Sequence, residues 1–286
     1  MTRKTKTRKA IQENLDDSLP KDLMNNVVEH RVHLKFKNQK QKEFAKLIED
    51  NEIIICSGPA GVGKSFLAIA TALELIQKSN NSYKKLIIVN PNVVAGHTAA
   101  GYGHIKGTLR EKLEPLAAAS LDIIDKLIGG KQRNKLEEEG IIKLDGIAYI
   151  RGKTMDNTIL ILEEAQNTTP SEIKTLLTRI GINSKFIISG DLEQSDLFSD
   201  NKKTGLYDAM NRFKTIDEIK TFTFDIDDVV RNPIISKILK LYNKIEVIKT
   251  TELLIEGNVS NIPKSPLKDT PSLTDRFKKI SKLIKW

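Results

Sequence analysis

An eight-residue stretch, Gly58-Pro-Ala-Gly-Val-Gly-Lys-Ser65, limits the folds open to this chain more than any other feature. It follows the apolar, β-rich segment 52–57 and precedes segment 65–77, in which apolar residues recur at helical spacing. Glycines here let the backbone wrap closely around phosphate oxygens, while the N-terminus of the following helix favours negative charge. The pattern therefore predicts a buried strand, a phosphate-binding loop and a helix, in that order.

The residues of this loop have predicted roles in holding a nucleoside triphosphate. Lys64 is expected to reach the β- and γ-phosphates, and the Ser65 hydroxyl is expected to bind Mg²⁺. The predicted nucleotide contacts are Gly58, Pro59, Ala60, Gly61, Val62, Gly63, Lys64, Ser65 and Phe66.

Short apolar segments alternate with helical ones along residues 36–250. Strands are predicted at 52–57, 85–89, 158–163, 185–189, 220–224 and 245–248, the first two of them buried. Helices are predicted at 41–49, 65–77, 111–127, 171–180, 206–213 and 234–242, the third broken at Pro115 and the fourth capped by Ser171. Glycine-rich residues 95–107 predict a long loop. The alternation predicts an α/β fold: a parallel sheet between two layers of helices.

An acidic pair, Glu163-Glu164, follows the apolar segment 158–162. A phosphate loop needs a carboxylate at the end of a neighbouring strand to hold the water shell of the metal. Because adjacent strand residues point to opposite faces, we assign the two carboxylates different roles. Glu163 is expected near Mg²⁺, and Glu164 is expected to act as the general base that polarises the attacking water. The alternative is a solvated acidic pair.

The next apolar segment ends in Ser189-Gly190-Asp191-Leu-Glu-Gln194. Ligands of parallel sheets gather at the carboxyl ends of the strands, so a polar group here is placed to sense the γ-phosphate. We assign that role to Gln194, with Asp191 supporting it. The alternative is a simple turn at Gly190-Asp191.

Charge is concentrated at the two ends of the chain. The net charge is +9, of which residues 1–10 and residues 261–286 each carry +5, leaving −1 between them. We predict a flexible basic arm at 1–35, the α/β domain at 36–250, and at 251–286 a linker with a short basic amphipathic helix. The ends are either contacts for a nucleic-acid backbone or solvated tails, and the helix is able to dock on its own domain, a partner or a membrane surface.

The composition excludes several classes of protein. Hydrophobic residues make up 39% and charged residues 29%, which predicts a soluble globular chain. The longest apolar runs are too short to span a bilayer, so we expect no membrane partner. A single cysteine, Cys56, cannot form an internal disulfide. We therefore expect a cytoplasmic protein.

Together these motifs resemble those of the PhoH-like family of P-loop ATPases, related to the core domain of superfamily 1 helicases. The resemblance covers roughly residues 36–245. It rests on Asn38-Gln39, Gly58–Ser65, Gly103–Pro115, Tyr149–Thr154, Glu163–Thr168, Leu177–Gly181, Gly190–Gln194 and Asp228–Pro233. It implies a RecA-like sheet, ATP as the nucleotide, Mg²⁺-dependent hydrolysis, and action on RNA or single-stranded DNA as a helicase-like motor.

The resemblance also assigns residues. Gln39 looks like the glutamine that reads adenine, although it also suits a polar position at a helix end. Arg231 looks like the arginine that contacts the γ-phosphate, with Arg179 and Arg151 as rivals. Helicases of this type take that arginine from a second RecA-like domain, whereas we identify only one such domain in this sequence. We therefore expect a neighbouring subunit to supply the arginine, which implies a homo-oligomer, for example a hexameric ring.

Two departures from the family pattern keep an alternative open. Glu163 stands where the family has Asp, and segment 90–97 lacks the family's arginine and acidic residues. A longer side chain at the metal position leaves open the alternative of an ATP-gated oligomeric clamp that binds nucleic acid with little turnover. A small-molecule phosphotransferase is a further alternative, which segments 164–166 and 190–194 disfavour because they suit water activation and γ-phosphate sensing.

Overall fold

The computed structural model describes residues 32, 34–78, 83–91, 109–195 and 203–230, and the helical positions 234, 235, 237, 238, 240 and 241. The strands are β1 (Ile53–Ser57), β2 (Lys85–Asn90), β3 (Ile142–Gly146), β4 (Thr158–Leu162), β5 (Lys185–Gly190) and β6 (Ile219–Thr223). The α-helices are α3 (Gln39–Asp50), α4 (Lys64–Gln77), α5 (Leu109–Ile128), α6 (Gly130–Glu138), α7 (Pro170–Leu177) and α8 (Gly205–Arg212). Short 3₁₀ helices lie at η3 (Ile147–Ile150), η4 (Ala165–Asn167) and η6 (Ile226–Asp228).

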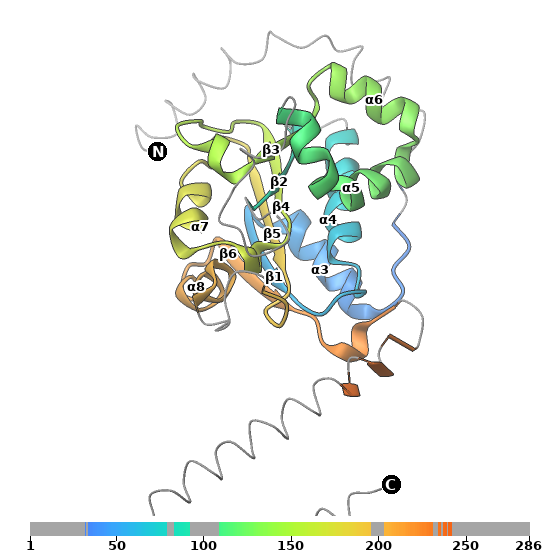
Figure 1. The fold of residues 1–286 in the computed structure, drawn as a ribbon, viewed down its shortest axis with the longest axis vertical. Helices are drawn as coiled ribbons and strands as arrows, with labels where there is room; N and C mark the ends of the chain where they lie inside the picture. The colour runs from blue at the N-terminus through green and yellow to red at the C-terminus, as the bar shows by residue number, and fades with distance from the viewer. Residues whose placement is uncertain are drawn as a thin grey trace, which may run out of the picture. The chain divides into compact units, whose positions relative to one another are not determined.

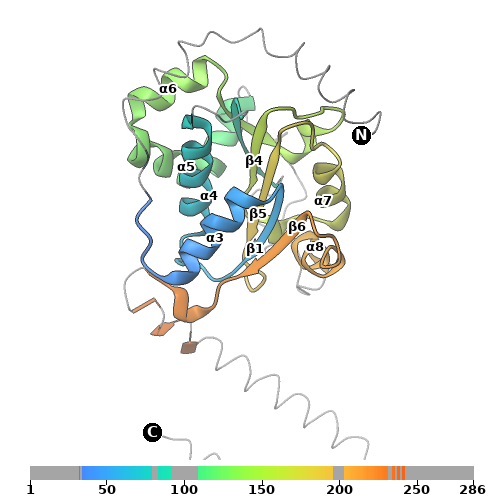
Figure 2. The ribbon, with the colours of Figure 1, turned by 180° about the vertical axis from the view of Figure 1, so that it is seen from behind.

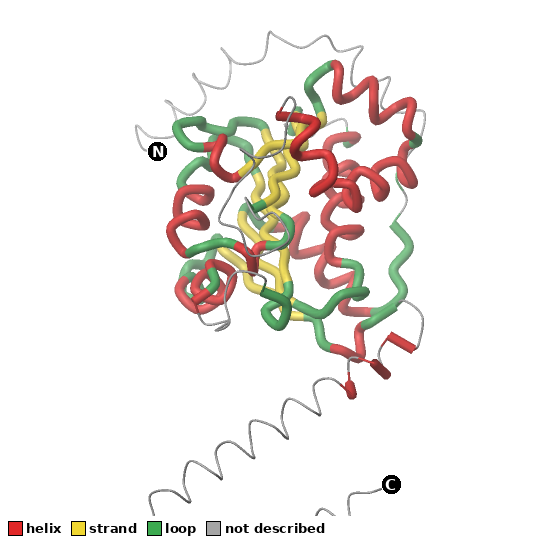
Figure 3. The backbone as a smooth tube through the Cα atoms, in the orientation of Figure 1, coloured by secondary structure: helices red, strands yellow, loops and turns green. Residues whose placement is uncertain are grey.

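Within the described residues the strands form one parallel sheet in the order β3-β2-β4-β5-β1-β6 (Figure 1). Because all strands run the same way, their carboxyl ends share one edge. The ends of β1, β4 and β5 therefore lie together there, and β5 separates the other two. Figure 3 shows the strands as one continuous layer between helices. This is the three-layer α/β fold predicted from the sequence.

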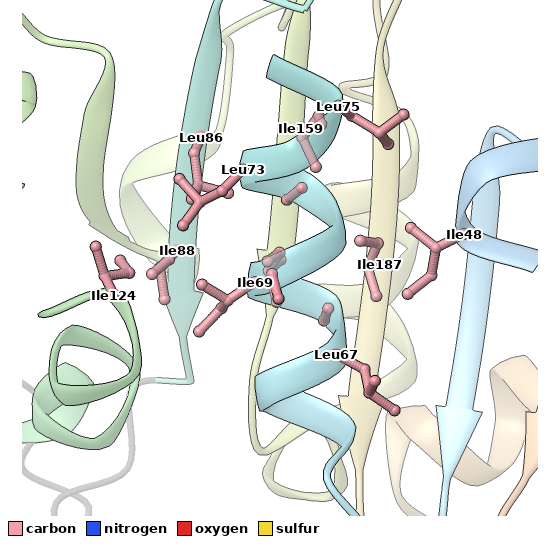
Figure 4. Close-up of a cluster of buried hydrophobic side chains, with 14 of the residues drawn as sticks. Ile48, Leu67, Ile69, Leu73, Leu75, Leu86, Ile88, Ile124, Ile159 and Ile187 are labelled. Carbon is pink, nitrogen blue, oxygen red and sulfur yellow. The ribbon is translucent and has the colours of Figure 1, made fainter. Parts of the chain in front are cut away.

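Helices cover both faces of the sheet, as Figures 1 and 2 show from opposite sides. One face packs against α3, α4, α5 and α6, and the other against η3, α7 and α8. The side chains of β1 alternate between the two cores: Ile54 and Cys56 face the first, Ile53 and Ile55 the second. Figure 4 shows the first core, where α4 packs on the sheet through Leu67, Ile69 and Leu73 against Leu86, Ile88, Ile159 and Ile187.

The structure corrects the prediction that the helix at 111–127 breaks at Pro115. Helix α5 runs without interruption from Leu109 to Ile128 with Pro115 inside it. A proline removes one backbone hydrogen bond. The buried residues Leu113, Ala117 and Ile124 anchor the helix on both sides of that point, so tertiary packing offsets the local cost.

Other boundaries also differ from those predicted. Helix α7 begins at Pro170, and its N-cap is Thr169, not Ser171. Thr169 forms a capping box with Glu172, in which each side chain accepts a hydrogen bond from the other residue's backbone N–H. Helix α6 and strand β3 were not predicted, because β3 is a half-polar edge strand without the apolar run of the inner strands.

The chain divides into two compact units, residues 1–236 and 237–286. All the helices and strands named above belong to the first unit. The basic ends, the loop at 95–107, the strand at 245–248 and the amphipathic helix at 273–285 lie outside the described residues. In the part of the chain that is described, no helix combines the length and the hydropathy needed to cross a bilayer.

A buried lysine at the start of β5 predicts a pH-dependent stability. Lys185 is 2% exposed, and its ammonium donates to the carbonyls of Glu49 and Asn51, at the end of α3. Burial lowers its pKa from 10.5 to about 8, against the opposing effect of nearby acidic residues. Between these pH values the unfolded chain binds more protons than the folded chain, so stability rises with pH across this window.

We expect the Lys185→Met variant to lack this rise. Each pKa unit corresponds to about 1.4 kcal/mol, so the rise in the wild type amounts to a few kcal/mol. Urea unfolding of both proteins at about pH 7.5 and pH 10 measures it. Equal slopes against pH in the two proteins would contradict the assignment.

Candidate nucleotide-binding site

The predicted phosphate loop connects the carboxyl end of β1 to the N-terminus of α4. Gly63 is the N-cap of α4 and has φ +96°, a left-handed conformation that favours glycine. At Gly58 a Cβ atom would lie 2.6 Å from the Cβ of Phe224, so only glycine lets the loop pass this close to the end of β6. The loop thus has the close-packed glycine geometry that a phosphate cradle requires.

Three neighbouring segments hold the loop in place. The Gly58 N–H donates to the Gly190 carbonyl at the end of β5 (3.2 Å). The Val230 N–H donates to the Gly61 carbonyl (3.2 Å), and Gln41 Nε2 donates to the Val62 carbonyl (2.9 Å). The loop is therefore fixed by bonds to α3, to β5 and to the segment after η6.

Lys64 lies at the first position of α4 and points back into the loop. Its Nζ donates to the carbonyls of Gly58 (2.5 Å) and Pro59 (3.0 Å). The ammonium is therefore inside the loop, where phosphate oxygens would replace these carbonyls as its acceptors.

The structure brings Ser65 and Glu163 into contact, although 98 positions separate them in the chain. Ser65 Oγ donates to Glu163 Oε2 at 2.6 Å, while Glu163 Oε1 is buried and has no hydrogen-bond partner. Burial raises the pKa of Glu163 to about 7, and the Ser65 hydroxyl and Lys64 oppose that shift. A buried carboxylate oxygen without a partner beside a serine hydroxyl is the hard oxygen donor set that Mg²⁺ prefers, so these two residues fit that ion.

Glu164 faces in a different direction from Glu163. Glu163 is 6% exposed, whereas Glu164 is exposed and has a left-handed backbone, with φ 52° and ψ 39°. This conformation is unfavourable for a non-glycine residue, and it turns the chain so that the two carboxylates occupy separate environments. Glu164 is thus open to solvent at the edge where the phosphate loop lies.

Asp191 joins the end of β5 to the phosphate loop. It is 7% exposed, and its carboxylate accepts a hydrogen bond from the backbone N–H of Glu193 (3.0 Å). Burial raises its pKa, and the Glu193 N–H, Lys64 and the Ala60 N–H of the loop oppose the rise, which places the carboxylate beside the loop. The side chain of Gln194 is exposed three residues later, so the structure brings Asp191 to the loop and leaves Gln194 at its border.

The structure does not bring Gln39 to the loop. Gln39 is exposed, and its amide donates to Glu43 one turn along α3. The glutamine that contacts the loop is Gln41, which is 4% exposed and lies on the same face as Phe44 and Ile48. A polar residue at core-facing helical spacing was the sequence signal that could have identified it.

The candidate arginines lie in different places. Arg231 is outside the described residues. The Arg179 carbonyl accepts from the Met155 N–H, three residues before β4 begins, so Arg179 lies at the amino-terminal edge of the sheet. Arg151 follows η3, which begins where β3 ends, and so lies nearer the carboxyl edge. Phe66 is 38% exposed in the first turn of α4.

Comparison with known proteins gives the same family from a family model and from curated relatives. The family model described as PhoH-like protein matches residues 33–243. A PhoH-like protein of Bacillus subtilis is 38% identical over 74% of this chain and 64% of its own length, and one of Synechocystis is 35% identical over 73% and 62%. The matched region thus spans less than two thirds of these relatives. The UvsW helicase of bacteriophage T4 aligns with a TM-score of 0.41 and 13% identity, over 73% of this chain and 68% of that one.

The family match includes the phosphate loop, the acidic pair at 163–164 and the end of β5, the same elements that the structure brings together at one edge of the sheet. This chain therefore belongs to the PhoH-like protein family, as a nucleotide-binding P-loop protein.

Proposed function

We propose that this protein is a Mg²⁺-dependent ATPase that acts on RNA or single-stranded DNA as a helicase-like motor. The contact between Ser65 Oγ and Glu163 Oε2, with the buried Oε1 left unbonded, carries the proposal. It supplies two oxygen ligands beside a phosphate loop. Glu164, the next residue, is exposed to the solvent that provides the attacking water.

In the proposed reaction a water molecule attacks the γ-phosphorus of ATP, and the bond to the ADP oxygen breaks. Glu164 accepts the proton of the attacking water. Lys64 Nζ and the backbone N–H groups of the loop bind the phosphate oxygens and stabilise the charge that develops on them. Ser65 and Glu163 would hold Mg²⁺, which neutralises further negative charge.

The alternative is an ATP-gated clamp that binds nucleic acid with little turnover. Glu163 in place of the family's Asp favours it, because the longer side chain changes the distance between the strand end and the metal. Glu163 Oε2 nevertheless lies 2.6 Å from Ser65 Oγ, so the extra methylene does not keep the carboxylate from the expected metal position.

A homo-oligomer such as a hexameric ring is part of the proposal, because a γ-phosphate arginine completes sites of this kind. Arg179 lies at the edge of the sheet opposite the phosphate loop, and a five-residue strand spans about 17 Å. Arg179 is therefore better placed to contact the nucleotide of a neighbouring subunit than its own. Arg231 is retained as the first candidate from the family resemblance.

A hollow beside η3 and α7 supports contact with a polymer. It has a volume of about 410 Å³ and is lined by Ile147, Ala148, Arg151, Thr169, Ser171, Glu172 and Thr175. Arg110, Arg133 and Arg212 are ion-paired, whereas no carboxylate in the described part of the chain pairs with Arg151. Tyr149, on the same turn, is 44% exposed. A guanidinium with no carboxylate partner among the described residues, two positions from an exposed ring, suits a phosphate with a stacked base.

The test is ATP turnover with and without single-stranded RNA across a salt series, for the wild type and Arg151→Gln. We expect RNA to stimulate the wild type, and Arg151→Gln to bind RNA more weakly. Its log–log salt slope should be smaller by about 0.7, the value for one phosphate of a single strand that the protein no longer neutralises. Basal turnover that also falls in Arg151→Gln would instead assign Arg151 to the γ-phosphate. Lys131→Gln on α6, on the other face of the sheet, is the control. No stimulation by RNA or DNA in the wild type would contradict the motor.

A further inference from the structure

Gln166 connects the ends of two strands that each contribute to the site. It lies in η4, just after β4, and is 2% exposed. Its Nε2 donates to Glu164 Oε2 at 2.6 Å, and its Oε1 accepts from the Asp191 N–H at 2.9 Å. The orientation of the amide is unambiguous, because a carboxylate beside it acts as acceptor and a backbone N–H acts only as donor.

The connection continues from Asp191 to the phosphate loop. The Asp191 carboxylate lies beside that loop, where Lys64 and the Ala60 N–H oppose the rise of its pKa. Two hydrogen bonds therefore connect Glu164 through Gln166 to Asp191, whose carboxylate lies beside Ala60 of the loop. This connection starts at the proposed general base and ends where the phosphates would bind.

The backbone makes room for Gln166 at one specific position. A Cβ atom at Gly190 would lie 2.5 Å from Gln166 Oε1 and 3.0 Å from the Gln166 N atom. It would also lie 2.7 Å from Leu206 Cδ2, so an alanine there would displace the glutamine amide, the leucine side chain or both. Glycine at the end of β5 thus leaves room for the connection, independently of its part in any turn.

We propose that Gln166 is a positioning residue that fixes the Glu164 carboxylate relative to Asp191 and the phosphate loop. The inference rests on the proposed hydrolysis. Glu164 is exposed and its side chain would otherwise be free to rotate, so one short bond to a buried, immobile amide holds it in place. Both ends of the Gln166 amide are engaged and the residue is buried, so it acts through Glu164 and does not contact the nucleotide.

The experiment compares Gln166→Met and Gln166→Glu with Thr168→Val. Methionine keeps the length of the side chain and removes both bonds. Glutamate keeps the acceptor for the Asp191 N–H but loses the donor to Glu164. Thr168 is fully buried after the same 3₁₀ helix and its hydroxyl donates to the Ala165 carbonyl, so Thr168→Val controls for damage to this segment.

We expect kcat to fall about 10²-fold in Gln166→Met and Gln166→Glu, because a misplacement of about 1 Å near the reacting atoms has an effect of that size. The Kd of a fluorescent ATP analogue should stay within about threefold of the wild-type value, and Thr168→Val should keep wild-type kcat. Gly190→Ala should also lower kcat, because its Cβ atom would clash with the Gln166 amide. Circular dichroism checks that each variant folds.

Three results would overturn the inference while leaving the hydrolytic function intact. The first is a wild-type kcat in Gln166→Glu. The second is a loss of kcat in Thr168→Val as large as that in the Gln166 variants. The third is a loss of nucleotide affinity in the Gln166 variants that parallels their loss of kcat. A wild-type protein that does not hydrolyse ATP would overturn the proposed function and this inference together.

Discussion

Lys64→Ala is expected to lower nucleotide affinity or turnover by a factor on the order of 10² or more while the protein remains folded. The ammonium lies inside the phosphate loop and donates to Gly58 and Pro59, and no other cation of the described residues is bonded there. Removing it leaves the charge of the triphosphate without its principal partner. Titration with a fluorescent ATP analogue and a phosphate-release assay measure the two effects.

Lys64→Met separates the charge from the packing, because methionine keeps most of the aliphatic stem. The two variants should lose activity equally. Lys46→Ala, at an exposed position on α3, should behave as the wild type. Turnover of Lys64→Ala within about twofold of the wild type would refute the site, whereas a protein that fails to fold would show itself in the circular dichroism spectrum.

Glu164→Gln is expected to reduce kcat by about 10²- to 10⁴-fold and to leave ATP binding intact. Glutamine retains the size of the side chain and an oxygen that accepts the hydrogen bond from Gln166, so the local geometry persists. The variant lacks the carboxylate that accepts the proton of the attacking water. Single-turnover phosphate release, with ATP affinity measured in parallel, distinguishes chemistry from binding.

The Glu164→Gln variant also distinguishes the hydrolysing motor from the clamp with little turnover. If the protein is a clamp with little turnover, phosphate release by Glu164→Gln will be indistinguishable from that of the wild type. Glu138→Gln, on α6, controls for the removal of one acidic charge away from the site. A large decrease in Glu164→Gln alone supports hydrolysis as the function.

The sequence was informative wherever a local pattern carries the signal. The inner strands β1, β2, β4 and β5 were predicted because each is a short apolar run. The edge strand β6 was also predicted, although only Ile219 of its residues is buried. The phosphate loop was predicted because its glycines allow the backbone to wrap around phosphate. Edge strand β3 and helix α6 were missed because half-polar segments have no strong period. The predicted break at Pro115 was wrong because the packing of α5 is not visible in its own sequence.

The candidate site shows the same division between local and long-range information. Lys64, Ser65, Glu163 and Glu164 were identified from motifs, and the structure brings them to one edge of the sheet. The roles of Gln41 and Gln166 depend on partners in other elements. The spacing of Gln41 indicates that it faces the core, but the neighbouring sequence identifies neither Val62 nor Asp191 as the partner of these glutamines.

The sequence alone determined the α/β class, the phosphate loop and the acidic residues facing it, because these follow from glycine conformation and from the two-residue and 3.6-residue periods of strands and helices. Only the tertiary structure decided which glutamine supports the loop and which way each carboxylate of the acidic pair faces. It also decided how the end of β5 is bonded to the segment that carries the acidic pair. The reason is physical. Hydrogen bonds between segments far apart in the chain depend on strand order and on close backbone approach, and neither leaves a periodic pattern in the sequence.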